Sequence, residues 1–269
     1  MRRLAGIGWA AARAAAPSTF KRFAAGTACC LLLGSNSLAG ESAGRQGVFL
    51  APGWGKLSFK APPPGSYELP VIDTAAGGEV LDANGRAVDL DELLGEKPTL
   101  LSFIYRTCDD VNGCPLSTMV LYTIGNKIAA QPELTDQLRL LTLSFDPEFD
   151  TPEVMKEYSK SILGDAKMDW HFLTTASENK IQPILQAYQQ SVVPDPDAAS
   201  GSRRKFSHLL RVYLIDRHKQ VRNIYSLSFI HPDILINDVK TLVLEGQRSQ
   251  PVRDATMEAS IADQDSAAR

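Results

Sequence analysis

Three short, almost continuous apolar runs occupy the middle of the chain, at residues 98–105, 138–145 and 209–216. Runs of this length without polar alternation are typical of strands that are buried on both faces of a sheet. Segments of helical character separate them, which predicts an α/β protein in which right-handed crossovers connect the strands. The predicted helices cover residues 115–130, a segment that begins near 150, residues 179–190 and a closing segment at 232–244.

Shorter patterns add a hairpin before the first run and further strands after it. Residues 79–82 and 86–90 flank an Asn-Gly pair, which is a strong signal for a two-stranded hairpin. Residues 170–173 predict a short strand, and residues 221–225 are expected to pair back onto the 209–216 strand. Residues 194–205 are rich in small and charged residues and predict a flexible loop before that strand.

The two ends of the chain differ from this alternating core. Residues 40–74 are rich in Gly, Pro and Ala and predict an extended arm or linker. Residues 247–269 are small and polar and predict a disordered tail. The predicted globular domain therefore covers residues 75–246.

The first 39 residues have the organisation of a secretory signal. Residues 1–40 carry five basic residues and no acidic one, an apolar run follows at 23–34, and small residues precede a cleavage site after Ala39. A run of 12 residues is too short to span a bilayer, which takes about 20. A retained N-terminal anchor and a mitochondrial presequence are the alternatives to a cleaved signal.

Composition narrows the class of protein further. Apolar residues make up 44% and charged residues 22% of the chain, as in ordinary soluble globular proteins. Without the five basic residues of the N-terminus, 23 basic residues face 31 acidic ones, a charge of −8. A chain this acidic lacks the cationic footprint that nucleic-acid binding needs, so we expect no nucleic-acid partner.

Removal of the signal would leave Cys108 and Cys114 as the cysteines of the chain. Cys108 follows the end of a predicted strand and Cys114 precedes a predicted helix, so both lie at the carboxyl edge of the sheet. Such a pair can form a structural disulfide, a redox couple or part of a metal site. Because a helix start favours a thiolate and Asp109 and Asp110 oppose one by like charge, we predict that Cys114 has the lower pKa.

A third metal donor would have to be a histidine, since no third cysteine remains. We expect His208 to start the third long strand, at the sheet edge that a crossover would bring near the cysteine loop. Two thiolates and an imidazole suit Cu(I), whereas zinc usually takes four ligands and would need an acidic residue or water in addition. The other histidines, His171, His218 and His231, fit packed or solvated positions better.

Three separated motifs resemble the Sco/SenC family, in the order in which that family carries them. The first is the strand that ends at Tyr105, followed by Cys108 and by the Cys114-Pro115 pair. The second is Asp146-Pro147-Glu148 with Asp150-Thr151-Pro152-Glu153-Val154, and the third is His208 eight residues before Asp216. The resemblance covers roughly residues 79–246.

This resemblance implies a thioredoxin-like fold, with a central mixed sheet flanked by helices and an N-terminal hairpin. It also implies copper, as Cu(I) or as Cu(II), held by Cys108, Cys114 and His208, with the residues of the Asp-Pro motif shaping the neighbouring loop. Such proteins face the periplasm or the outer side of the inner membrane, or the mitochondrial intermembrane space. Their membrane-proximal partner is a copper-receiving oxidase subunit or another exported cuproprotein. They deliver copper to the dinuclear copper site of cytochrome c oxidase during its assembly, or reduce the cysteines of that site.

The cysteine spacing departs from the family pattern. The family usually has three residues between its cysteines, with proline after each, whereas five residues, Asp-Asp-Val-Asn-Gly, intervene here and Asp109 follows Cys108. The longer acidic loop weakens the case for copper relative to a purely redox role. The alternative function is therefore a thiol–disulfide oxidoreductase that acts through Cys108 and Cys114 without stable copper binding.

Overall fold

The computed structural model of the chain describes residues 49–131, 134–195 and 205–248. The predicted signal and nearly all of the predicted tail lie outside these ranges. None of the helices within the described ranges is long and apolar enough to cross a membrane.

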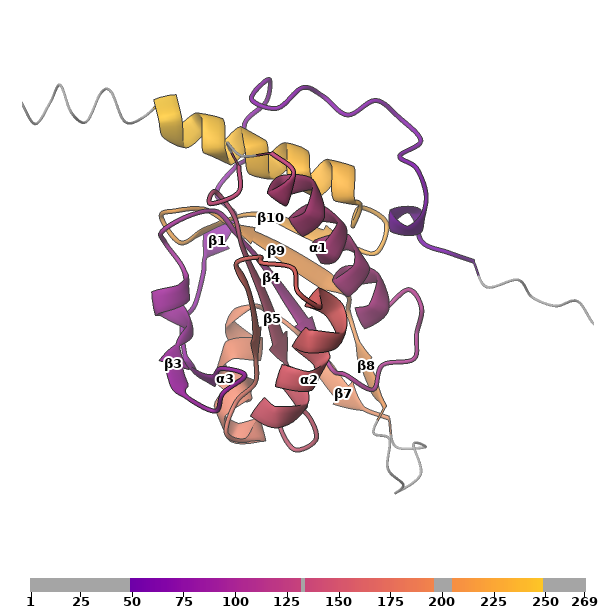
Figure 1. The fold of residues 1–269 in the computed structure, drawn as a ribbon, viewed down its shortest axis with the longest axis vertical. Coiled ribbons are helices and arrows are strands. Elements are labelled where there is room, and N and C mark those ends of the chain that lie inside the picture. The colour runs from indigo at the N-terminus through magenta and orange to yellow at the C-terminus, as the bar shows by residue number, and fades with distance from the viewer. Residues whose placement is uncertain (1–48, 132–133, 196–204, 249–269) are drawn as a thin grey trace, which may run out of the picture. The chain divides into compact units, whose positions relative to one another are not determined.

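A six-stranded mixed sheet forms the centre of the described domain (Figure 1). Its central strand is buried along its whole length, which explains the continuous apolar run at residues 98–105. The next two strands along the chain run parallel to it on one side, and an antiparallel strand flanks it on the other. In spatial order the strands are β1 (Asp73–Thr74), β10 (Gln220–Ser226), β9 (Arg211–Ile215), β4 (Thr99–Ile104), β5 (Arg139–Ser144) and β6 (Trp170–Leu173).

Helices cover both faces of this sheet, and Figure 1 shows α1 and α2 in front of it with α3 on the far side. The start of α2 follows from its sequence, because Thr151 accepts a hydrogen bond from the Val154 N–H and Pro152 occupies the first helical position. The helices are α1 (Cys114–Ala129), α2 (Pro152–Leu163), α3 (Glu178–Ala187) and a C-terminal helix at residues 232–248, with 3-10 turns η1 (Pro52–Trp54) and η2 (Leu90–Leu93).

The predicted N-terminal hairpin is confirmed as β2 (Glu79–Leu81) paired with β3 (Ala87–Asp89). Gly85 in its turn has a φ of 77°, a left-handed conformation that favours glycine. A second two-stranded ribbon was not predicted: β7 (Val192–Pro194) pairs antiparallel with β8 (Phe206–His208).

This ribbon corrects two predictions. His208 does not begin the long strand; it ends β8 opposite Val192, and β9 begins only at Arg211 after an exposed Leu209. The predicted loop at 194–205 likewise has structured ends, because the Asp195 N–H donates to the Lys205 carbonyl at 2.9 Å. Both errors have the same physical cause. The two strands β7 and β8 are only three residues long and pair across the intervening residues, so neither segment shows a periodic pattern in the sequence.

The described part of the arm, residues 49–74, lies along the body of the domain. The Tyr67 hydroxyl donates to Asp238 at 2.5 Å, and the Gly65 N–H donates to the Thr241 hydroxyl at 3.0 Å. These bonds fasten the arm to the C-terminal helix, which runs four residues beyond its predicted end at 244.

Candidate metal centre

The loop between β4 and α1 carries both cysteines and folds back on itself. The Gly113 N–H donates to the Asp110 carbonyl at 2.8 Å, and the Asn112 N–H donates to the Asp110 carboxylate at 3.0 Å. A Cβ at position 113 would lie 3.1 Å from the Cys108 sulfur, so glycine allows that sulfur to approach the start of α1. Cys114 is the first residue of the helix and is buried, whereas Cys108 in the loop is half-buried. Both cysteines are free thiols.

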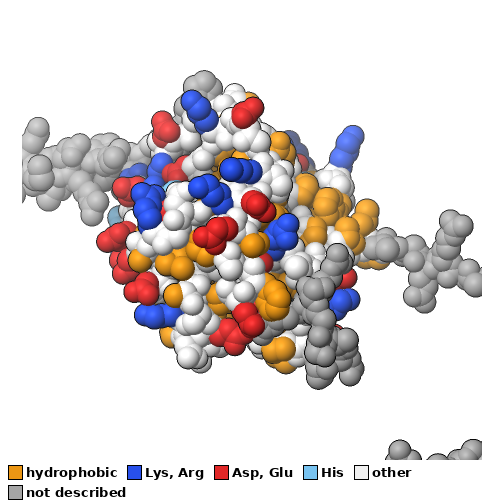
Figure 2. All heavy atoms as spheres, turned by 60° about the horizontal axis from the view of Figure 1, so that its bottom comes forward, with side chains coloured by type: hydrophobic (Ala, Val, Ile, Leu, Met, Phe, Trp, Pro, Cys, Tyr) orange, Lys and Arg blue, Asp and Glu red, His pale blue; other side chains and the backbone are white. Residues whose placement is uncertain are grey.

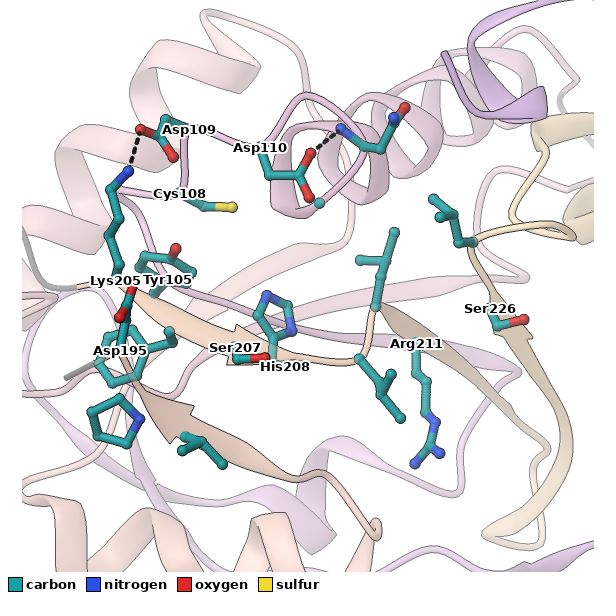
Figure 3. Close-up of a pocket in the computed structure, with 18 residues that line it drawn as sticks. Tyr105, Cys108, Asp109, Asp110, Asp195, Lys205, Ser207, His208, Arg211 and Ser226 are labelled. Atoms are coloured by element: carbon teal, nitrogen blue, oxygen red, sulfur yellow. Dashed lines mark hydrogen bonds and ion pairs between the residues drawn. The ribbon is translucent and has the colours of Figure 1, made fainter. Parts of the chain in front are cut away.

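His208 reaches the cysteines from the end of β8, on the opposite wall of the site (Figure 3). Its ring makes edge contacts with two aromatic rings, with centroid distances of 6.0 Å to Tyr105 and 5.0 Å to Phe145. These two aromatic residues follow the ends of the parallel strands β4 and β5, and Phe206 of β8 packs on both. The strand ends therefore build the wall that orients the imidazole.

The three predicted donors come together. One ligand atom from each of Cys108, Cys114 and His208 lies within 4.8 Å of the others, and no other such group of three occurs in the described ranges. His208 Nε2 is 3.7 Å from the Cys114 sulfur, while its Nδ1 is buried without a hydrogen-bond partner among the described residues. The remaining histidines lie elsewhere: His171 bonds Asp169 at 2.8 Å, His231 bonds the Gly55 carbonyl at 3.2 Å, and His218 lies in the turn between β9 and β10.

The SCO1/SenC family model matches residues 75–244, which is more than half of the chain. The chain belongs to the SCO1/SenC family. A SCO2-like protein of Rickettsia prowazekii is 25% identical over 183 residues, which cover 65% of this chain and 82% of that protein.

Solved structures of Sco proteins share the fold. The copper-bound ScoI of Bradyrhizobium japonicum is 27% identical, with a TM-score of 0.52, and the match covers 63% of this chain and 99% of that one. The copper-bound ScoI of Arabidopsis thaliana is 22% identical, with a TM-score of 0.53, and covers 64% of this chain and 99% of that one. The predicted thioredoxin-like fold of this Sco/SenC protein is therefore confirmed.

The electrostatics of the cysteine pair reverse our prediction. A hydrogen bond from the Cys114 thiol lowers the pKa of Cys108 to about 4; burial opposes this, whereas His208 and the backbone N–H groups of Cys114 and Asp110 add to it. The same hydrogen bond, burial and the neighbouring negative charge hold the pKa of Cys114 well above its ordinary value. The thiolate of this Sco/SenC protein is therefore Cys108, and the prediction that Cys114 has the lower pKa was wrong.

The two aspartates that follow Cys108 do not oppose its ionisation as we predicted. The carboxylate of Asp109 forms an ion pair with Lys205 at 3.3 Å, and Figure 3 shows this pair beside the cysteine. Asp110 turns its carboxylate to the Asn112 N–H, while its own N–H faces the Cys108 sulfur. The two carboxylates therefore bind Lys205 and the Asn112 N–H, and Asp110 presents its backbone N–H to the Cys108 sulfur, where it stabilises the thiolate.

Asp150, which belongs to the second of the family motifs, holds the start of the cysteine loop in place, as the family resemblance implies. Asp150 is buried and accepts hydrogen bonds from the Arg106 N–H at 2.9 Å and from the Ser144 hydroxyl at 2.5 Å. Burial raises the pKa of Asp150, although these two donors oppose the rise. Asp150 therefore fixes the chain two residues before Cys108, at the point where it leaves β4.

An open cleft of about 710 Å³ gives access to Cys108 and His208. Exposed apolar side chains from three segments line it, namely Val193 of β7, Leu209 after β8 and Leu227 after β10. Figure 2 shows exposed hydrophobic side chains in several patches among charged ones on the face that this view brings forward. Cys114 does not line the cleft, so an approaching molecule meets Cys108 and His208 first.

Sequence reasoning missed four residues that support this site. The rings of Tyr105 and Phe145 were visible only as the last apolar residues of two strands, and Phe206 lay between the predicted loop at 194–205 and the predicted strand at 209–216, in a segment with no predicted element. No pattern in the sequence indicated that the side chain of Asn112 binds the arm. Long-range contacts of this kind have no signal in the local sequence.

Proposed function

We propose that this Sco/SenC protein binds copper through Cys108, Cys114 and His208 and delivers it to the dinuclear copper site of cytochrome c oxidase during assembly. The observation that carries the proposal is the convergence of two thiols and one imidazole within 4.8 Å. Soft sulfur donors select Cu(I), and three donors satisfy it. Among the described residues, the buried Nδ1 of His208 has no hydrogen-bond partner, which adds a polar atom that a ligand could satisfy.

The arrangement suits transfer of the metal to another protein. Cys108 and His208 line an open cleft, whereas Cys114 is buried beneath them. A partner's donor can therefore replace the two accessible ligands in turn while the third still holds the ion. The apolar rim of Val193, Leu209 and Leu227 offers a surface for a protein partner.

We place this activity outside the cytoplasm. The basic and apolar pattern of residues 1–39 supports export, by a cleaved signal or a retained anchor, to the periplasm or the outer face of the inner membrane. The mitochondrial intermembrane space is the alternative. The partner is a copper-receiving oxidase subunit or another exported cuproprotein.

A second candidate function is reduction of a disulfide in the target protein, favoured by two free thiols that lie close together with one of them open to the cleft. Cys108 as thiolate would attack the target disulfide and release one target thiolate. Cys114 would then attack the mixed disulfide, which frees the second target thiol and leaves a Cys108–Cys114 disulfide. Two electrons pass from this protein to the target, so a reductant of the compartment must restore the pair.

A Cu(I) titration of the reduced protein against a competing chelator tests the first function. We expect a 1:1 complex that is lost in Cys108→Ser and Cys114→Ser and greatly weakened in His208→Ala. His218→Ala is the matched control, because that residue lies in a turn away from the cleft. A wild-type protein that binds no copper against the chelator, yet reduces a target disulfide equally well with and without His208, would establish the second function instead.

A further inference from the structure

The arm ahead of the domain is hydrogen-bonded to the cysteine loop, and two of the bonds are made by one side chain. The Ala51 N–H donates to Asn112 Oδ1 at 2.8 Å, and Asn112 Nδ2 donates to the Phe49 carbonyl at 2.7 Å. The amide of Asn112 thus pairs with the backbone of the arm through both of its polar atoms. A third bond lies alongside, since the Trp54 indole N–H donates to the Val111 carbonyl at 3.2 Å.

The arm is itself fixed against the domain where it makes these bonds. Ala51 and Gly53 are buried, and Gly53 packs so closely that a Cβ there would lie 2.2 Å from the Ile230 carbonyl oxygen. Ile230 directly precedes the segment that leads into the C-terminal helix. The arm therefore gives the cysteine loop a rigid support from a distant part of the chain.

The loop needs such a support because of its length. Five residues separate the two cysteines, and each added residue of a flexible loop increases the entropy lost when its ends are held together. Within the loop, the bonds from Gly113 and Asn112 to Asp110 close only its second half. Asn112 and Val111 are the loop residues for which the described structure records hydrogen bonds to the arm.

We propose that Asn112 is a positioning residue, through which the arm holds the loop closed and keeps Cys108 within bonding range of the other two donors. This inference rests on the proposed function for its copper readout, but the closeness of the two thiols can be measured without copper. It assigns to residues 49–54, which precede the family-matched region, a role in setting the affinity of the metal centre.

Two variants in the full-length protein remove the contact from either side. Asn112→Ala deletes both hydrogen bonds. Ala51→Pro deletes the donor of the arm, at a position whose φ of −62° already suits proline. Asn237→Ala is the matched control, because Asn237 Nδ2 donates to the Pro62 carbonyl at 2.8 Å and so ties the same arm to the C-terminal helix, away from the loop.

Two measurements report on the loop. The first is the Cu(I) dissociation constant against a competing chelator. The second is the equilibrium of the metal-free dithiol with glutathione disulfide, in which Cys108 and Cys114 form a disulfide, two electrons pass to the glutathione disulfide and two glutathione thiols are released. Thiols held close together have a high effective concentration toward each other, so a loosened loop disfavours the protein disulfide.

We expect Asn112→Ala and Ala51→Pro each to weaken Cu(I) binding roughly tenfold, the size typical of losing a group that orients a metal ligand. We expect the same variants to lower the glutathione equilibrium constant by a similar factor, while Asn237→Ala matches the wild type in both. If Asn112→Ala matches Asn237→Ala in both measurements, the inference is overturned. If the wild type binds no copper, the proposed function fails, and the glutathione equilibrium alone then supports or overturns the role of Asn112.

Discussion

The rate at which Cys108 reacts with an alkylating reagent should level off at a pH well below that of an ordinary cysteine. Its thiolate accepts hydrogen bonds from the Cys114 thiol, from His208 and from two backbone N–H groups, which together lower the pKa of Cys108 to about 4. The experiment varies the pH for the reduced, metal-free wild type and for the His208→Ala variant. In that variant one of the donors to the thiolate is missing.

The size of the effect decides which feature of the rate profile to measure. At pH 7 an ordinary cysteine with a pKa of about 8.5 is roughly 3% thiolate, whereas Cys108 is almost fully ionised, a gain of about 30-fold. A thiolate of lower pKa is also a weaker nucleophile, and over about 4.5 pKa units a Brønsted slope of 0.4–0.5 costs roughly 100-fold. The two effects nearly cancel, so the rate at pH 7 is uninformative and the midpoint of the profile is diagnostic.

The assay is the initial rate of iodoacetamide alkylation between pH 3.5 and 10, with the modified cysteine identified by mass spectrometry. We expect a midpoint near pH 4 for Cys108 in the wild type. In His208→Ala the midpoint should rise but stay below 8.5, because the Cys114 thiol and the backbone donors remain. His218→Ala should leave it unchanged. A wild-type midpoint near 8.5, or first modification at Cys114, would refute the assignment of the thiolate.

Three further outcomes follow from the structure. Burial opposes ionisation of Asp169, yet hydrogen bonds from His171 and Lys97 and the charge of Arg139 outweigh it and hold its pKa well below its usual range. Its ionised form therefore contributes stability above pH 4 that is lost as the pH falls further, and Asp169→Asn should flatten that loss in urea unfolding between pH 6 and 3. Asp150→Ala should lower the free energy of unfolding by about 2 kcal/mol, because the buried Ser144 hydroxyl and the Arg106 N–H lose their acceptor, and an unchanged urea midpoint would contradict this. Free Cu(I) at a hundred times its dissociation constant should stabilise the wild type by about 2.7 kcal/mol, and Cys114→Ser should show no such shift in thermal unfolding.

Local patterns in the sequence predicted the layered core well. Strand β4 and its neighbours β5 and β9 are buried on both faces, so each appears as a continuous apolar run that needs no knowledge of its partners. The Asn-Gly turn of the hairpin and the capped start of α2 are equally local. The candidate donors followed from residue type and order, and the place of the two cysteines followed from the rule that sites lie at the carboxyl ends of the strands.

Features that depend on distant pairings could not be predicted. The ribbon of β7 and β8 aligns Val192 with His208, and neither segment has an alternating pattern long enough to reveal it. The same holds for the arm, whose Gly- and Pro-rich composition conceals the contacts of Ala51 and Phe49 with Asn112.

The thiolate assignment failed for a related reason. Neighbours in sequence, Asp109 and Asp110, were counted as charges acting on Cys108, but their carboxylates bind Lys205 and a backbone N–H instead. The helix start was expected to favour ionisation of Cys114, but the hydrogen bond between the Cys114 thiol and Cys108, together with burial, outweighs the dipole and raises the pKa of Cys114. Charge effects on a pKa depend on orientation and burial, which sequence distance does not report.

X-ray absorption at the copper edge of the Cu(I)-loaded protein tests the central claim most directly. We predict a first shell of two sulfur atoms and one nitrogen atom in the wild type, with the nitrogen lost in His208→Ala and one sulfur lost in Cys108→Ser. His171→Ala should leave the shell intact. A first shell of oxygen and nitrogen alone, or a shell unchanged by replacement of Cys108 or His208, would contradict a copper centre built from these three residues.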